Sequence, residues 1–206
     1  MLAATVIGSG IAAQNLAGGN IAIALLANAI ATGAILYVLI SMFGPLSGAH
    51  FNPAVSIAFA LRRELSWGRC GLYMVVQVAG MIFGAFIAHA MFELPIFQLS
   101  ATTRALTGMA VGELVATFGL VLTIFGLKDS DAPRVPAAVA LYITSAYWFT
   151  SSTSFANPAI TIARSLSNTF AGIAPASVPV FLGCQLAGML AAVVLVAWLW
   201  PAKVAR

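Results

Sequence analysis

Charged residues are scarce in this chain: they make up only 7% of its 206 residues, and just five are acidic. Soluble domains carry about 25% charged residues, so this sequence cannot build a water-facing surface. The scarcity therefore excludes a soluble globular protein. The net charge of +4 does not indicate nucleic-acid binding, because the basic residues are spread over short loops between apolar segments.

Cysteine and histidine are also rare, with two of each. Cys70 and Cys184 lie in or near apolar segments, where a cysteine is usually an inert packing residue. Their spacing suggests neither a disulfide framework nor a metal site. The few acids and histidines offer no nucleophile beside a base, so we expect no enzyme activity, no metal and no cofactor.

Hydrophobic residues, by contrast, make up 62% of the chain, and the mean hydropathy is +1.03. About 20 apolar residues span a bilayer, so we predict an all-α membrane protein with six transmembrane helices. The first apolar segment is too short to cross, and we expect a truncated first helix that lacks an N-terminal stretch. The six segments are residues 1–14, 20–42, 70–91, 108–127, 135–150 and 179–200.

One tripeptide, Asn-Pro-Ala, occurs twice in the chain. Proline suits the first turn of a helix, and the preceding asparagine can cap the helix start. Each copy opens an apolar run of about ten residues, which spans only half a bilayer. We therefore predict two re-entrant half-helices whose positive N-terminal ends meet at the membrane midplane. The copies are Asn52-Pro53-Ala54 and Asn157-Pro158-Ala159, 105 residues apart.

Further matches between the two halves indicate an internal repeat. Leu36-Tyr37 matches Leu141-Tyr142 at the same offset of 105, and the segment 77–81 matches 185–189 at an offset of 108. Each half holds three spans, an odd number, so the second repeat must be inverted in the membrane. We predict a single channel domain over residues 1–206, with repeats at 1–93 and 108–200.

The basic residues predict how the chain is oriented. With the N-terminus in the cytoplasm, seven basic residues fall on the cytoplasmic side and two outside, which obeys the positive-inside rule. We therefore expect a multi-pass protein of the plasma (inner) membrane with both termini in the cytoplasm. The cytoplasmic set is Arg62, Arg63, Arg69, Lys128, Arg134, Lys203 and Arg206, and the outer pair is Arg104 and Arg164.

The segments 47–55 (SGAHFNPAV) and 154–159 (SFANPA), set in six spans with an inverted repeat, resemble the aquaporin family of major intrinsic proteins. The resemblance covers nearly the whole chain, and two intact Asn-Pro-Ala motifs at this spacing are a specific signal. It implies six tilted helices around one pore per chain, and a homotetramer in the lipid bilayer. The run after the second motif resembles bacterial aquaglyceroporin-like members linked to arsenic resistance.

Passive passage of water and small neutral solutes is the function that this resemblance implies. An uncharged solute loses hydrogen bonds on entering an apolar pore. The amides of Asn52 and Asn157 are expected to replace them, together with backbone carbonyls of the re-entrant loops. The two helix ends would repel cations and hinder proton relay. On the alternative interpretation, the asparagines only cap the helices and fix the loops.

A second constriction decides which solutes pass in this family. Members usually carry an arginine directly after the second Asn-Pro-Ala, and this chain has Ile160 there. Counting back from the motifs without gaps places the other three filter positions at Thr32, Ser145 and Ser154. We predict a wide, hydroxyl-rich filter without arginine, which would pass glycerol, urea and metalloid acids such as arsenite as well as water.

Three further residues are candidates for supporting roles. Arg164 lies four residues after Ile160, on the same helix face, so it could reach back to the filter; we favour an arginine that snorkels outward. Glu113 is an acid within a span, and the family resemblance favours a carboxylate that holds a re-entrant loop over a proton relay. His50 is expected to pack its loop rather than to gate the pore with pH.

A coupled secondary transporter is the alternative to a passive channel, because inverted repeats with broken helices also build transporters. Ion coupling usually needs acids or other ligands at the midplane, and Glu113 alone is thin support for it. Flux that persists in liposomes without any ion gradient would identify the passive channel.

Overall fold

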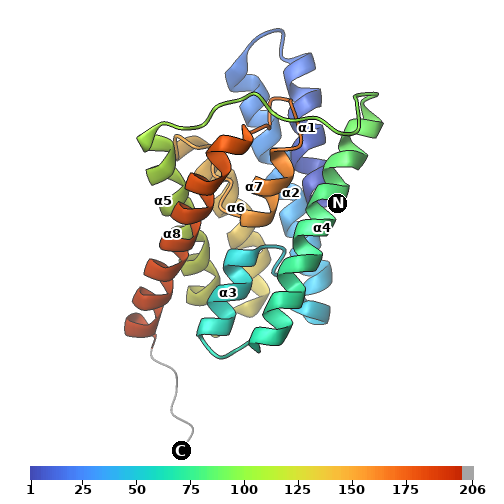
Figure 1. Cartoon of the computed structure of the whole chain (residues 1–206). Coiled ribbons are helices and arrows are strands. Elements are labelled where there is room, and N and C mark those ends of the chain that lie inside the picture. The colour runs from blue at the N-terminus through green and yellow to red at the C-terminus, as the bar shows by residue number, and fades with distance from the viewer. Residues whose placement is uncertain (201–206) are drawn as a thin grey trace, which may run out of the picture.

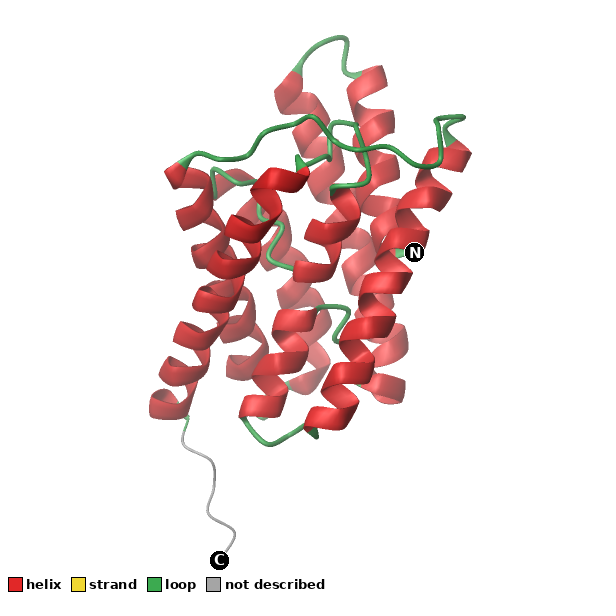
Figure 2. Ribbon diagram, viewed as in Figure 1, coloured by secondary structure: helices red, strands yellow, loops and turns green. Residues whose placement is uncertain are grey.

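A computed structural model describes residues 1–200 of the chain, and within them all regular structure is helical (Figures 1 and 2). Lys203 and Arg206 lie outside the described residues. Two short 3₁₀ turns, Ala132–Arg134 and Pro175–Ser177, precede α6 and α8. The α-helices are α1 (Leu2–Leu16), α2 (Ile21–Ser47), α3 (Pro53–Leu61), α4 (Trp67–Met91), α5 (Thr107–Leu127), α6 (Val135–Phe149), α7 (Pro158–Arg164) and α8 (Val178–Leu199).

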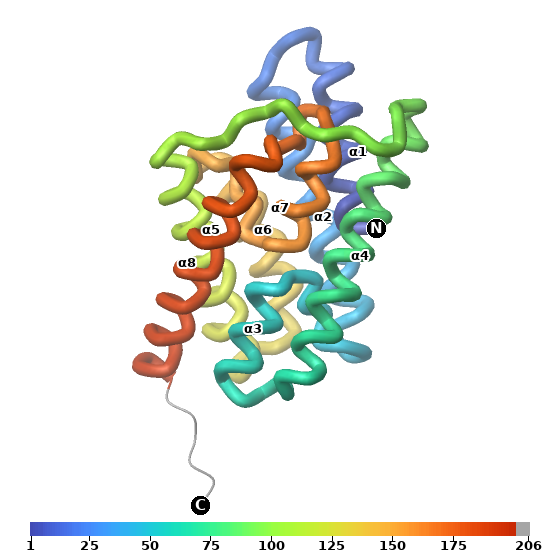
Figure 3. Tube along the Cα trace, in the orientation of Figure 1, coloured from blue at the N-terminus to red at the C-terminus, as the bar shows by residue number. Residues whose placement is uncertain are grey.

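Six of these helices run along a bundle, and the short helices α3 and α7 enter it from opposite ends (Figures 1 and 3). Four of the six, α2, α4, α5 and α8, are long and apolar enough to cross a membrane. The other two, α1 and α6, have 15 residues each, and α1 begins near mid-height of the bundle (Figure 1). The predicted all-α membrane fold with two half-helices and a short first helix is confirmed. We call the half that holds α3 the α3 side and the opposite half the α7 side.

Local chemistry explains where the half-helices begin. The Oδ1 atom of Asn52 accepts the N–H of Ala54 at 2.9 Å, and Oδ1 of Asn157 accepts the N–H of Ala159 at 3.0 Å. A proline occupies the first helical position in both, where its missing N–H leaves no bond unmade. Both helices therefore start at the residue that the sequence predicts.

Glycine allows the long helices to approach closely at two important places. A Cβ atom on Gly188 of α8 would lie 2.1 Å from the backbone oxygen of Leu114 in α5. A Cβ atom on Gly33 of α2 would lie 2.1 Å from Oγ1 of Thr144 in α6. Small residues permit such contacts between membrane helices, so the α5–α8 and α2–α6 pairs approach more closely here than a Cβ atom would allow.

A long segment, residues 92–106, connects α4 to α5 and crosses the α7 side of the bundle over α7 (Figures 1 and 3). Its backbone is tied to the segment that follows α7: the N–H of Ser100 donates to the carbonyl of Ser165 at 3.0 Å, and the N–H of Ala174 to that of Thr102 at 2.7 Å. The ring of His89 bridges the same two segments: its Nδ1 lies 2.7 Å from the carbonyl oxygen of Ile96, and its Nε2 lies 2.9 Å from Oγ of Ser167. The loop that follows α7 is therefore held in place from outside.

Candidate functional site: a cavity between two half-helices

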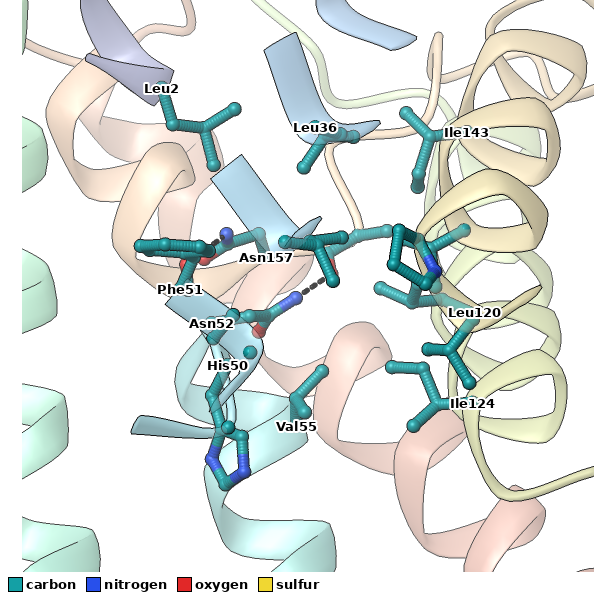
Figure 4. A pocket seen from close by; sticks show the side chains of 18 of the residues that line it. Leu2, Leu36, His50, Phe51, Asn52, Val55, Leu120, Ile124, Ile143 and Asn157 are labelled. Atoms are coloured by element: carbon teal, nitrogen blue, oxygen red, sulfur yellow. Dashed lines mark hydrogen bonds between the residues drawn. The ribbon is translucent and has the colours of Figure 1, made fainter. Parts of the chain in front are cut away.

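A cavity of about 520 Å³ follows the middle of the bundle. On the α3 side it is lined by residues of α2 and of the α5–α6 connection, among them Pro45, Lys128 and Pro133. Asn52 and Asn157 line its middle, and Figure 4 shows them facing a wall that includes Leu120 and Ile124. The cavity thus has a polar strip opposite an apolar wall, which suits an uncharged solute that makes a few hydrogen bonds.

The two asparagines each bond to the opposite re-entrant loop. Nδ2 of Asn52 donates to the carbonyl of Ala156 at 2.7 Å, and Nδ2 of Asn157 donates to the carbonyl of Phe51 at 2.8 Å. Figure 4 shows the two amides close together, with both bonds dashed. A side-chain amide carries two N–H groups, so each asparagine keeps one donor beyond this bond. The pair joins the two repeats at the cavity and still offers hydrogen bonds.

The loops before the two motifs share an unusual backbone conformation. Ala49 and Phe51 have φ of 48° and 49°, and Ser154 and Ala156 have φ of 49° and 47°. These positions match at the offset of 105 between the repeats. Left-handed backbone at a non-glycine residue costs of order 1 kcal/mol or more and persists only where neighbours enforce it. Both loops are therefore forced into the same strained shape.

Glu113 of α5 holds the second loop. Its Oε1 accepts the N–H of Phe155 at 2.8 Å, and its Oε2 accepts the N–H of Ala156 at 2.9 Å. Nε2 of Gln185 also donates to Oε2 and lies 2.9 Å from Oγ1 of Thr161 in α7. The carboxylate is completely buried and both of its oxygens are engaged. This geometry is that of an anchor for the loop, not of a proton carrier.

In the first repeat, neutral groups hold the half-helix. Nε2 of Gln77 donates to Oγ of Ser56 at 3.0 Å, the counterpart of the Gln185 contact with α7. Nδ1 of His50 lies 3.1 Å from the same hydroxyl, and its ring packs on Phe59 with centroids 4.4 Å apart. His50 lines the cavity on the α3 side and is also part of the loop packing.

The α7 end of the cavity brings together three of the four predicted filter residues. Thr32, Ser154 and Ile160 all line it, and each is no more than 4% exposed. The structure contradicts the prediction for Ser145, whose side chain is exposed on α6 and bonds the carbonyl of Tyr142 at 2.7 Å. The count without gaps was wrong by two residues there, and two positions correspond to about 200° around a helix.

Tyr147 occupies the place that was assigned to Ser145. Five residues of α6 line the cavity: Val135, Pro136, Val139, Ile143 and Tyr147. Apart from Pro136, they repeat every four positions and so share a helix face. The hydroxyl of Tyr147 lies 3.1 Å from Oγ1 of Thr32. This periodicity is visible in the sequence and could have identified the tyrosine.

Arg164 also lines the cavity, which contradicts the expectation that it snorkels outward and that the filter lacks arginine. Its side chain is 2% exposed, and Nε donates to the carbonyl of Ala171. The guanidinium carbon lies 3.3 Å from the centroid of the Phe155 ring. Arg104 lies over the same ring at 5.0 Å and donates to the carbonyl of Gly172 at 2.9 Å. We call Thr32, Tyr147, Ser154, Ile160 and Arg164 the filter ring.

Comparison with known proteins agrees with this geometry. The family model described as "Major intrinsic protein" matches residues 1–151. The chain belongs to the major intrinsic protein family. It is 51% identical over 199 residues to "Aquaglyceroporin AqpS" of Rhizobium meliloti (strain 1021), covering 97% of this chain and 85% of that protein. "Aquaporin NIP2-1" of Zea mays is 33% identical over 162 residues, which are 73% of this chain and 54% of the maize protein.

Membership in the major intrinsic protein family makes this protein a passive, multi-pass membrane channel for water and small neutral solutes. "Aquaporin-4" of Mus musculus is a more distant relative, 32% identical over 116 residues that are 54% of this chain and 36% of the mouse protein. The cavity, the paired asparagines and the two half-helices supply what such a channel needs: a path, hydrogen bonds along it, and positive helix ends at its middle.

Replacing the loop anchor should disable the channel. In Glu113→Gln, an amide NH₂ would face a backbone N–H or the NH₂ of Gln185, so at least one buried donor loses its acceptor. We expect the free energy of unfolding to fall by about 1.5–3 kcal/mol, the usual value of a hydrogen bond to a charged group. We also expect a marked fall in water permeability. Thermal unfolding in detergent and stopped-flow light scattering on proteoliposomes would measure the two effects.

The matched control is Glu93→Gln, which makes the same chemical change at an exposed residue that follows α4. Thermal stability and water permeability should both stay at wild-type values in this variant. Wild-type stability and permeability in Glu113→Gln would show that the carboxylate does not hold the loop.

Proposed function

We propose that this channel conducts uncharged solutes larger than water, with glycerol, urea and trihydroxyl metalloid acids such as arsenous acid as candidates. The observation that carries the proposal is the composition of the filter ring. Position 160 holds an isoleucine, and three hydroxyl groups, on Thr32, Tyr147 and Ser154, line the same end of the cavity. Hydroxyl groups both donate and accept, so they can replace the hydration of a polyhydroxyl solute. The 51% identity to a protein named an aquaglyceroporin supports the same solute class.

Asn52 and Asn157 then act as the donors at the middle of the path. Their second N–H groups are placed to bond to the oxygen of a passing solute, while the first ones hold the loops together. Because α3 and α7 both begin here, the positive ends of two helix dipoles add to this donor site. A cation at this point would meet repulsion from both ends, and a neutral solute would not.

Arg164 supplies the fixed positive charge of the filter ring in this proposal. It comes from the last residue of α7, one turn beyond Ile160, and the carbonyl of Ala171 and the ring of Phe155 hold it in the cavity wall. A guanidinium in a desolvated wall raises the energy of a cation at that level of the pore. It can also donate hydrogen bonds to an oxygen-rich solute.

The membrane orientation and assembly complete the proposal. We place the α3 side in the cytoplasm of a plasma (inner) membrane protein whose two termini are cytoplasmic. Five basic residues lie at the loops and helix ends of the α3 side, and Arg104 lies in the loop across the α7 side. We also propose a homotetramer in which residues 1–206 form one channel domain per chain. The five residues are Arg62, Arg63, Arg69, Lys128 and Arg134.

Placing an arginine at position 160, directly after the second motif, tests which solutes the channel conducts. In Ile160→Arg, a second guanidinium would enter the filter ring beside Arg164, so we expect glycerol, urea and arsenite permeability to fall by about tenfold or more while water still passes. Stopped-flow light scattering on proteoliposomes would measure all four solutes. Leu166→Arg, which adds the same charge just beyond α7 and off the cavity lining, is the control. Identical permeability profiles in Ile160→Arg and the wild type would contradict the filter assignment.

Removing the charge of Arg164 tests cation exclusion. We expect Arg164→Ala proteoliposomes to leak monovalent cations. Arg164→Lys proteoliposomes keep a positive charge at this position and should remain impermeable to cations. A fluorescent indicator of sodium or proton flux gives the readout. Arg134→Ala serves as the control, because Arg134 is exposed and pairs with Asp131 at 2.9 Å on the α3 side. Arg164→Ala vesicles that conduct water but remain impermeable to cations would contradict a role of Arg164 in cation exclusion.

A further inference from the structure

We propose that the hydrogen bond between Tyr147 and Thr32 is a latch that closes the filter ring, and that each passing molecule must open it. The inference rests on the proposed filter and adds a specificity-determining residue, Tyr147, which the sequence count had missed. The two residues lie 115 positions apart, on α6 and α2, and their hydroxyl oxygens are 3.1 Å apart.

The lining of the cavity ends at the filter ring on the α7 side. Its lining reaches Thr32, Tyr147 and Arg164, and no residue of the described segments 92–106 or 165–175 beyond the ring takes part in it. Tyr147 and Thr32 are 3% and 4% exposed, although both belong to the cavity wall. The bonded pair therefore lies where the path to the α7 side is shut.

The helix backbones at this closure are packed too closely to move apart and open it. Gly33, next to Thr32, lets α2 approach α6 until a Cβ atom at this position would lie 2.1 Å from Oγ1 of Thr144 and 3.2 Å from the carbonyl of Ala140. Helices packed this closely resist small rearrangements, because packed interiors have little free volume. Rotation of the Tyr147 side chain is then the available way to open the ring.

The cavity that Tyr147 and Thr32 line also holds a hydroxyl group without a hydrogen-bond partner. Oγ of Ser154 is buried, lines the cavity, and has no hydrogen-bond partner among the described residues. An unpaired buried hydroxyl is costly, so a molecule that bonds to it lowers the free energy of the open ring. A solute that both donates and accepts can bond to Ser154 while it replaces the Tyr147–Thr32 bond. A molecule without such groups would open the latch at a net loss.

The chain offers a matched pair of tyrosines on α6 to test this latch. Tyr147→Phe removes the hydroxyl and keeps the ring. Tyr142→Phe removes a hydroxyl that bonds to backbone carbonyls of Val115 and Ala116 in α5, away from the cavity lining. Thr32→Val removes the other hydroxyl of the latch and keeps a side chain of nearly the same shape as threonine. Purified variants in proteoliposomes would be compared by stopped-flow for water, glycerol and urea.

We expect Tyr147→Phe and Thr32→Val each to raise water permeability by roughly two- to tenfold, the factor that one net hydrogen bond contributes. The double variant should show no further gain, because both changes remove the same bond. Tyr142→Phe should match the wild type. Water permeability that stays constant or falls in Tyr147→Phe, or gains that add in the double variant, would overturn the latch.

The same data separate the two proposals. Wild-type vesicles that pass water but neither glycerol nor urea would contradict the proposed solute range, and the water measurements would still decide the latch. Wild-type vesicles that pass all three solutes, with Tyr147→Phe unchanged, would support the solute range and reject the latch.

Discussion

The structure depends on two reciprocal hydrogen bonds at the centre of the membrane. Asn52 bonds to the loop before Asn157, and Asn157 bonds to the loop before Asn52. Helix starts carry N–H groups without partners, and such groups are costly at membrane depth, where no bulk water can satisfy them. Each asparagine meets part of this need with its oxygen, which caps its own helix, and uses its nitrogen to fix the opposite loop. One residue type thereby stabilises the fold and leaves a donor for the solute.

The strain in the loops and their anchors can be understood from the same bonds. The left-handed conformations at Phe51 and Ala156 occur at the residues whose carbonyls accept the asparagine amides. The second loop is fixed by the carboxylate of Glu113, and the first half-helix by Gln77 acting on Ser56. A rigid support of this kind is what holds donors at fixed positions along a path. The passive channel therefore holds its hydrogen-bonding groups at fixed positions and needs no ion gradient.

Much of this arrangement could be predicted from the sequence because its signals are local. Asparagine followed by proline marks a helix start wherever it occurs, and two copies at one offset indicate the repeat. The filter was harder to predict. Its α6 position depends on how the chain between α6 and α7 is folded, so the count of residues selected Ser145 instead of Tyr147. The orientation of Arg164 depends on Ala171 and Phe155, which come from two different loops and are placed only by the tertiary fold.

A structure of the protein in a lipid nanodisc, at a resolution that reveals ordered water, would test the central claim most directly. We predict that the side-chain nitrogens of Asn52 and Asn157 lie about 3 Å from the carbonyl oxygens of Ala156 and Phe51. We also predict a continuous file of water in which one molecule bonds to both asparagines. Amides turned away from the opposite loops, or a dry and closed centre between α3 and α7, would contradict it.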